Sequence, residues 1–305
     1  MVDERALTRS FASLFGKPGR QVTVGIGDDA AVVRNQAQQS VLACDPVVEG
    51  VHFESTAPAA LIGAKAVNRN LSDLAAMGAV PDYLLVSLLL PGDLTSPRRR
   101  SLLRGLRTAA DRAGCVIVGG DVARTPGPLT VTVTAVGHLS GRILRRKDAR
   151  AGDTVHVTGR LGGSALGRHL RFRAATDEGV WLSKCSGIGA VIDVSDGFLL
   201  DLHTLLIASG GLGAEIDAEA VPVHPSSRRL ARRTGRTPLE HALEDGEDHV
   251  LLFTVRKDAR LRVPPRFSEV MKEPVGVLSR RPGLRLRRAD GGLVKLSPKG
   301  FKHDL

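Results

Sequence analysis

The first half of the chain alternates short apolar runs with longer segments in which apolar residues recur every three or four positions. The short runs predict buried strands, and the recurring pattern predicts amphipathic helices. We expect helices over 4–15, 59–77 and 98–113, and strands over 41–43, 84–90, 116–118 and 129–136. This alternation is typical of an α/β fold.

A polar stretch over 138–153, rich in Arg and Gly, interrupts the pattern. One hydrophobic core rarely grows beyond about 250–300 residues, so a chain of 305 residues can hold two domains. We place them at 1–140 and 141–305. In the second domain we expect strands over 155–158, 190–194, 214–216, 250–255, 275–278 and 284–288, and helices over 164–171 and 198–208.

Acidic residues stand where apolar runs stop, at six places in the chain. They are Asp28–Asp29, Asp45, Asp73, Asp121, Asp193 with Asp196, and Glu247–Asp248. Carboxylates at the ends of buried strands would repel one another if they converged, unless protons or cations lay between them. Hard divalent cations with oxygen ligands are the natural counterions, and they often accompany phosphates. The pattern therefore indicates an enzyme that uses metal ions and a nucleotide.

Each acid also has a simpler structural interpretation. Asp73 could lie near the exposed end of an ordinary helix, and Asp196 could be the N-cap of the helix that begins at Phe198. Asp121 follows Gly119 and Gly120 at what we expect to be the end of a strand, where a bare backbone can approach a ligand. Helix capping explains only one of the two acids in DVSDG.

The familiar nucleotide-binding motifs do not explain the chain. GIGDDA, at 25–30, formally matches the dinucleotide pattern, but two aspartates there would oppose a pyrophosphate. The P-loop motif is absent, and so are the protein-kinase signatures. If ATP is the ligand, acids, metal ions and glycines must hold it.

Composition excludes several classes of protein. The net charge is +11, but the basic residues come in scattered pairs and aromatic residues make up only 3%. We therefore expect no nucleic-acid partner, since bases would find few rings to stack on. No apolar run approaches the ~20 residues of a membrane helix. Three widely spaced cysteines and a charged N-terminal segment lead us to expect reduced thiols in a cytoplasmic protein.

Six motifs in order resemble those of thiamine-monophosphate kinase. They are GIGDDAAVV, CDPVVEGVHF, NLSDLAAMGA, GGD, DVSDG and DGEDHVLLFTV. That family belongs to the superfamily of aminoimidazole ribonucleotide synthetase and selenophosphate synthetase. The resemblance implies a two-domain synthetase-like architecture: an N-terminal sheet domain used for dimerisation, a C-terminal α/β domain, and ATP in the cleft between them. It implies a homodimer that phosphorylates thiamine monophosphate to thiamine diphosphate.

The resemblance also implies roles for individual residues. Several Mg²⁺ ions would be held by Asp29, Asp45, Asp73, Asp121, Asp193 and Asp196. ATP would contact Gly120, Asp121, Arg146 and Ser195, and thiamine monophosphate would contact His52, Glu247 and Phe301. No side chain would act as a general acid or base, because the transfer would be direct, in line and assisted by the metal ions.

The chain departs from the family pattern at a few positions. Ala43-Cys44 stands where Ser-Thr is usual before the aspartate, His249 replaces a Tyr, and Phe301 replaces a Tyr or Trp. These changes keep open a second hypothesis, another ATP-dependent synthetase or kinase of the same superfamily that acts on a different small anion. A non-enzymatic nucleotide or nucleic-acid binder is a third hypothesis, suggested by the basic charge and by the hydroxyl ligand that Ala43-Cys44 lacks.

Overall fold

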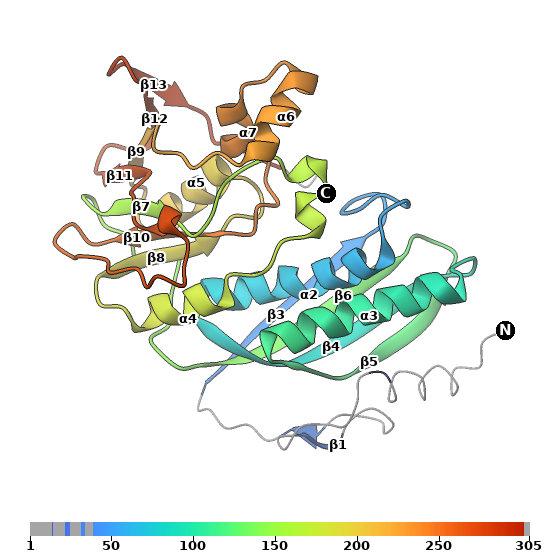
Figure 1. Cartoon of the computed structure of the whole chain (residues 1–305). Helices are drawn as coiled ribbons and strands as arrows, with labels where there is room; N and C mark the ends of the chain where they lie inside the picture. Colours follow the sequence, from blue (N-terminus) through green and yellow to red (C-terminus); the bar gives the residue numbers. More distant parts are fainter. Residues whose placement is uncertain (1–13, 15–21, 25–31, 34–38, 302–305) are drawn as a thin grey trace. The chain divides into compact units, whose positions relative to one another are not determined.

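The computed structural model of the protein describes residues 14, 22–24, 32–33 and 39–301 (Figure 1). The chain forms two compact units, one of Met1–Leu74 with Val80–Leu139 and one of Ala75–Ala79 with Ser140–Leu305. The helix expected over 4–15 and the GIGDDA motif with Asp29 lie outside the described residues.

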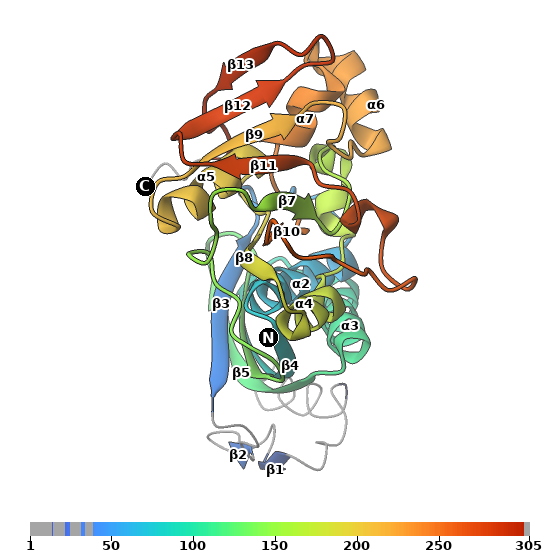
Figure 2. The same ribbon diagram turned by 90° about the vertical axis from the view of Figure 1, so that its left-hand side faces the viewer.

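A four-stranded sheet with two helices on one face forms the first unit (Figures 1 and 2). Its elements are β3 (Ser40–Val48), α2 (Ala59–Ala76), β4 (Ala79–Pro91), α3 (Ser96–Ala113), β5 (Val116–Thr125) and β6 (Thr130–Leu139). The strand order is β3-β6-β4-β5, so β3 and β5 are the edges. A small separate sheet pairs β1 (Val22–Val24) with β2 (Val32–Val33).

Alternate residues of β6 are buried against the helices, which is typical of a sheet with one covered face. The other face is apolar as well. It carries Leu42, Leu85 and Leu89, whose exposed fractions are 69%, 41% and 39%. Large exposed leucines on a sheet face are typical of a surface that another body covers.

The helix over 98–113 is confirmed as α3, and its ends have local causes. The Thr95 side chain accepts a hydrogen bond from the Arg98 N–H, and Pro97 lies in the first turn, where no backbone donor is needed. Gly114 ends the helix in the left-handed conformation. Leu102, Leu103 and Leu106 are buried on the side that packs in the unit.

The second unit is built on a seven-stranded sheet with the order β13-β12-β9-β11-β7-β10-β8. The strands are β7 (Thr154–Val157), β8 (Ile188–Asp193), β9 (Gly213–Asp217), β10 (Leu251–Val255), β11 (Gly276–Ser279), β12 (Gly283–Arg287) and β13 (Leu293–Leu296). Every residue of β8 and β10 is buried. Along β10, Leu252 packs in one core cluster, while Leu251 and Phe253 pack in another. Because both faces are covered, these strands have continuous apolar runs.

Helices cover the sheet of the second unit. They are α4 (Thr176–Lys184), α5 (Phe198–Ala208), α6 (Pro225–Thr234) and α7 (Pro238–Glu244), with short 3₁₀ turns at Ser164–Leu166, Arg168–Leu170 and Glu269–Met271. The expected helix over 198–208 is confirmed as α5. The helix expected over 164–171 is wrong, since Gly163 and Gly167 have positive φ and break it into two 3₁₀ turns.

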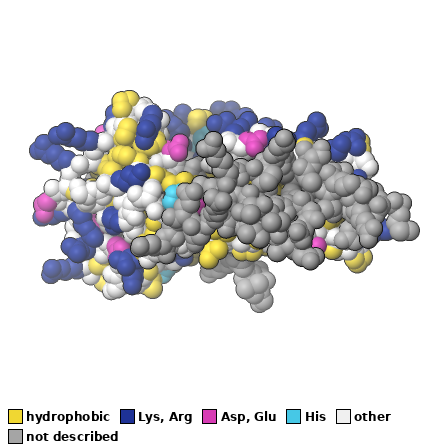
Figure 3. Space-filling model, turned by 90° about the horizontal axis from the view of Figure 1, so that it is seen from below, with side chains coloured by type: hydrophobic (Ala, Val, Ile, Leu, Met, Phe, Trp, Pro, Cys, Tyr) yellow, Lys and Arg dark blue, Asp and Glu magenta, His cyan; other side chains and the backbone are white. Residues whose placement is uncertain are grey.

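No helix in the described part of the chain is long and apolar enough to cross a membrane. On the face drawn in Figure 3, Lys and Arg side chains lie scattered, with acidic and apolar side chains between them. The three cysteines are free thiols: Cys44 is exposed, Cys115 buried and Cys185 half-buried.

Candidate functional site

The DVSDG motif forms the turn from β8 into α5. Asp193 ends β8 and is 4% exposed. The N-cap of α5 is Gly197, with φ of 121°, so the interpretation of Asp196 as a simple N-cap is wrong. Instead Asp201, in the first turn of α5, accepts hydrogen bonds from the Asp196 and Gly197 N–H groups at 3.0 and 3.1 Å. Capping of α5 therefore does not account for the Asp196 carboxylate.

Asp201 completes an acidic cluster that the sequence did not reveal. It is 4% exposed, and its pKa is raised to about 8, first by burial and then by the charges of Asp193 and Asp196. Burial and the two neighbouring acids thus favour the protonated form of the Asp201 carboxyl. The carboxylate oxygens of Asp193 and Asp196 are of the kind that a divalent metal ion prefers.

Metal-free protein is expected to lose stability as pH rises because of Asp201. Its carboxyl keeps a proton in the fold up to about pH 8, whereas the unfolded chain releases it near pH 4. The free energy of unfolding therefore falls between these pH values, by up to about 1.4 kcal/mol per pH unit. Asp201→Asn should remove this part of the slope, and Asp258→Asn, at an exposed position, should not. Urea unfolding in EDTA at pH 5 and pH 8 checks this; equal slopes for wild type and Asp201→Asn would contradict it.

The segment 245–249 is fastened to the DVSDG turn by its backbone. The Glu247 N–H donates to the Ser195 carbonyl at 2.7 Å, and the His249 N–H donates to the Val194 carbonyl at 2.8 Å. Gly246 has φ of 76°, and a Cβ there would lie 2.9 Å from the Ser195 carbonyl oxygen. Only glycine permits this approach.

The end of the described chain reaches the same turn. The Phe301 N–H donates to the Asp196 carbonyl at 2.8 Å, and the Phe301 ring is 51% exposed. The structure therefore brings together four predicted site residues from three distant segments, namely Ser195, Asp196, Glu247 and Phe301.

Glu247 has a partner that sequence reasoning missed. Nδ1 of His169 lies 3.3 Å from its carboxylate, and the Glu247 side chain is 34% exposed. Glu247 has φ of 53°, unusual for a residue other than glycine. A strained backbone that is held in place by neighbours is typical of functional positions.

Asp248 has a structural role beside them. Its carboxylate, 2% exposed, accepts from the Gly162 N–H at 2.9 Å and from the Ser164 hydroxyl at 3.1 Å, and it pairs with Arg168. Burial raises the pKa of Asp248 to about 6, although Arg168 and these hydrogen bonds act to lower it. The residue anchors the 3₁₀ turns that carry His169.

Arg146 lies beside the outer edge of the large sheet. The Val191 N–H of β8 donates to the Arg145 carbonyl at 3.1 Å, and β8 is an edge strand. The Ser209 hydroxyl donates to the Arg146 carbonyl at 3.0 Å, and the residue is exposed. These contacts fix the backbone of Arg146 near the C-terminal end of α5, and its role at a phosphate stays a prediction.

In the first unit, Asp45 lies inside β3 and not at its end, which corrects the sequence interpretation. Its carboxylate accepts a hydrogen bond from Nε of Arg69 at 2.9 Å. The Asp45 N–H donates to Oδ1 of Asn70 at 2.8 Å, and Nδ2 of Asn70 donates to the Asp45 carbonyl at 3.2 Å. Asp73 comes one helical turn after Arg69 on α2, so it lies on the same side of the helix. Sequence reasoning missed Arg69 as a partner of Asp45.

Asp121 also lies inside a strand, so the expected strand end at Val118 is wrong. The strand β5 continues through Gly119 and Gly120, with a register shift opposite Leu84 and Leu85. Gly120 has φ of 149°, and a Cβ there would meet the Val86 carbonyl oxygen at 1.8 Å. Because β3 and β5 are opposite edges, Asp45 and Asp121 of one chain are separated by three strand spacings, about 14 Å.

His52 lies in the turn after β3. Its Nδ1 accepts from the Val48 N–H at 3.0 Å, and its carbonyl accepts from Nζ of the fully buried Lys65 at 2.6 Å. Since Nδ1 is an acceptor, the neutral ring carries its proton on Nε2. That tautomer can donate a hydrogen bond to an anion.

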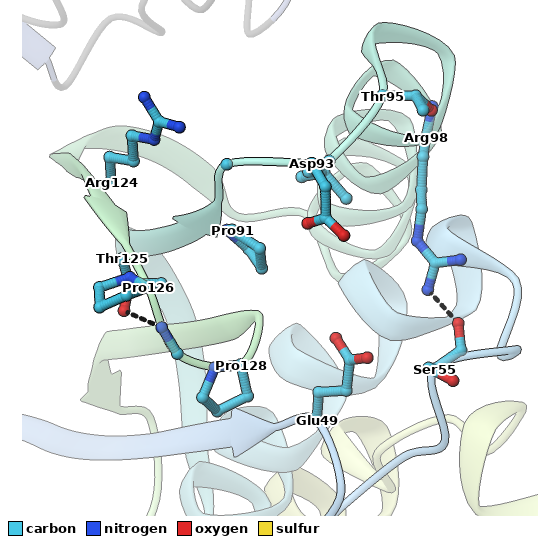
Figure 4. Close-up of a pocket in the computed structure, with 13 residues that line it drawn as sticks. Glu49, Ser55, Pro91, Asp93, Thr95, Arg98, Arg124, Thr125, Pro126 and Pro128 are labelled. Atoms are coloured by element: carbon cyan, nitrogen blue, oxygen red, sulfur yellow. Dashed lines mark hydrogen bonds between the residues drawn. The ribbon is translucent and has the colours of Figure 1, made fainter.

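A hollow of about 970 Å³ opens at the ends of β4 and β5. The carboxylates of Glu49 and Asp93 point into it, and Arg98 donates to the Ser55 carbonyl at 2.5 Å (Figure 4). None of the predicted site residues that the structure describes lines it. Two carboxylates and two arginines, Arg98 and Arg124, line the hollow, so it has no net positive charge to attract a phosphate.

No group of three or more His, Cys, Asp or Glu side chains within the described residues is arranged to hold a metal ion alone. Asp29 lies outside those residues. Mg²⁺ keeps several water or phosphate ligands and commonly takes only one or two protein carboxylates. The described acids are therefore suited to complete the shell of an ion that arrives with a nucleotide.

The sequence and the structure are both similar to known proteins. The family profile "AIR synthase related protein, N-terminal domain" matches residues 27–139. The thiamine-monophosphate kinase of Rhodopirellula baltica is 40% identical over 93% of this chain and 92% of its own, and that of Aquifex aeolicus is 33% identical over 91% and 92%. The solved structure of AaThiL complexed with AMPPCP and TMP superposes with a TM-score of 0.77 at 30% identity, covering 98% of this chain and 96% of that one.

Proposed function

The chain belongs to the thiamine-monophosphate kinase family, and we propose that it makes thiamine diphosphate by a single in-line transfer. The γ-phosphoryl group of ATP would pass to the phosphate of thiamine monophosphate, releasing ADP. The observation that carries the proposal is the meeting of Ser195, Asp196, Glu247 and Phe301 at one turn. That turn unites the residues expected for the nucleotide, the metal ions and the substrate.

No general base is needed for this reaction. The nucleophile is a phosphate oxygen that is already ionised at neutral pH, so the protein must orient two anions and offset their repulsion. Asp45, Asp73, Asp121, Asp193 and Asp196 would hold Mg²⁺ ions, with Asp29 as a further ligand. When bound, Mg²⁺ supplies charge neutralisation to both phosphates and to the transition state. Arg146 would add a charge-assisted contact to a phosphate.

The remaining residues suit an organic cation joined to a phosphate. The carboxylate of Glu247 is 34% exposed, and the backbones of Glu247 and of the exposed Phe301 are bound to the same turn. A carboxylate attracts a thiazolium charge, and an aromatic face stacks on a flat cation. Nε2 of His52 would donate to the substrate phosphate, since Nδ1 is held as an acceptor.

We also propose that the working form is a homodimer. The apolar face with Leu42, Leu85 and Leu89 is exposed in a single chain. Two four-stranded sheets that close edge to edge would bury both such faces and remove all four edges. If β3 of one copy pairs beside β5 of its partner, Asp45 and Asp121 from different copies lie on neighbouring strands, which the strand order within one chain does not allow.

A different anionic acceptor remains the second candidate. It is favoured by two departures from the usual family residues: His249, close to Glu247 in the sequence, and Cys44, next to Asp45. The Cys44 sulfur accepts a hydrogen bond from the Thr134 hydroxyl at 3.3 Å. A panel of phosphorylated acceptors, with ADP release as the readout, separates the two. We expect ADP release with thiamine monophosphate and not with other phosphomonoesters. Release with another acceptor alone would favour the second candidate.

A further inference from the structure

The His249 ring is the most anomalous polar group in the described part of the chain. The residue is 2% exposed, and neither Nδ1 nor Nε2 has a hydrogen-bond partner there. Its backbone has φ of 48°, in the left-handed region. A buried polar atom without a partner is costly, so the two ring nitrogens favour the binding of a polar or charged group beside them.

Neighbouring groups hold the ring in this position. It stacks on Phe172, with ring centroids 4.1 Å apart and an interplanar angle of 16°. The backbone N–H is fixed to the Val194 carbonyl. The ring therefore remains beside the end of β8 and cannot turn toward solvent without breaking these contacts.

Nδ1 of His249 lies near the carboxylate of Asp193, but too far from it for a hydrogen bond. It lies 3.9 Å from Oδ2 of Asp193, whereas a hydrogen bond would need about 2.7–3.2 Å. Two donors that are each about 2.1 Å from one metal ion lie between about 3.0 and 4.2 Å apart, depending on their angle. The separation of 3.9 Å falls within this range.

We propose that Nδ1 of His249 and the carboxylate of Asp193 ligate the same divalent cation, which gives this chain a mixed nitrogen–oxygen site. The proposal rests on the assignment of Asp193 as a metal ligand under the proposed function. The rest of the shell comes from nucleotide phosphates and water, since the described residues offer no third protein ligand there.

A nitrogen ligand changes which ion the site prefers. Imidazole binds first-row transition ions well, whereas Mg²⁺ favours oxygen ligands. The usual family residue at this position is a Tyr, so the preference is a property of this chain and not of the fold. The site therefore selects Mn²⁺ and related ions over Mg²⁺.

Electron spin-echo envelope modulation of bound Mn²⁺ tests the ligand directly. The full chain is loaded with Mn²⁺ and a non-hydrolysable ATP analogue, and modulation from ¹⁴N is recorded. We expect an imidazole signal in the wild type and in His203→Gln, which removes a half-buried histidine of α5. We expect its loss in His249→Phe, which keeps the stacked ring. No nitrogen signal in the wild type, or an unchanged one in His249→Phe, would overturn the proposal.

Ion preference gives a second readout. The ratio of the Mg²⁺ and Mn²⁺ dissociation constants, measured by calorimetry, should fall by about tenfold or more in His249→Phe. Metal-free His249→Phe should also melt above the wild type, because two unpartnered polar atoms are removed. His249→Asn serves as the second variant, since Asn tolerates this backbone conformation. An unchanged ratio in both variants would overturn the proposal. Neither readout uses turnover, so an inactive kinase and an absent nitrogen ligand are separate outcomes.

Discussion

A heterodimer of Asp45→Asn and Asp121→Asn chains is expected to show about half the wild-type kinase activity, although each variant alone is nearly inactive. Asp45 and Asp121 lie on opposite edge strands of one sheet. If each metal site takes Asp45 from one copy and Asp121 from the other, this heterodimer has one intact site and one site that lacks both acids. Differently tagged chains, co-expressed and purified through both tags, allow the measurement.

A matched control distinguishes a restored site in the heterodimer from residual activity of the single variants. Asp73 lies on α2 on the same side as Arg69, the partner of Asp45, so Asp45 and Asp73 belong to the same half of the site. A heterodimer of Asp45→Asn and Asp73→Asn would then have two damaged sites and should stay inactive. An inactive Asp45→Asn/Asp121→Asn heterodimer would show that one chain supplies each site on its own.

Gly246→Ala is expected to reduce kcat/KM by at least about a hundredfold and to destabilise the fold, because a small displacement at a phosphoryl-transfer site is costly. The residue has φ of 76°, and an added Cβ would press on the backbone of Ser195 and Asp196 at 2.9 Å. Relieving that clash moves Glu247 away from the turn that its N–H holds. Steady-state kinetics and urea unfolding measure the two effects.

Gly291→Ala is the control for backbone strain alone. Gly291 has φ of 81°, but nothing lies within 4 Å of an added Cβ. The substitution should cost about 1–2 kcal/mol of stability and leave kcat/KM unchanged. If Gly246→Ala behaves like this control, the close approach between the two segments has no functional role.

Part of the site could be predicted from local sequence. The turn over Asp193–Gly197 and the helix that follows it were predictable, because a continuous apolar run, a glycine and a new period of apolar residues mark its limits. The course of β5 was not predictable in the same way. Gly119 and Gly120 indicate a strand end, yet the strand continues because β4 supplies backbone partners beyond them.

Partners that come from distant segments could not be predicted. Arg69 binds Asp45, and His169 lies against Glu247, but no spacing in the sequence relates these pairs. The position of Asp201 was only weakly predictable, since an acid in the first turn of a helix is common and does not by itself indicate contact with the preceding turn. The caps of α7 gave a stronger local signal: Thr237, Pro238 and Glu240 form a capping box that sequence analysis could have used.

The central claim is tested most directly by incubating the purified protein with thiamine monophosphate and MgATP, and by separating the thiamine phosphates chromatographically. The account predicts thiamine diphosphate in amounts equal to the ADP released, and no product when EDTA removes the metal ions. Folded protein that binds ATP but forms no thiamine diphosphate would contradict it, as would formation that EDTA leaves unchanged.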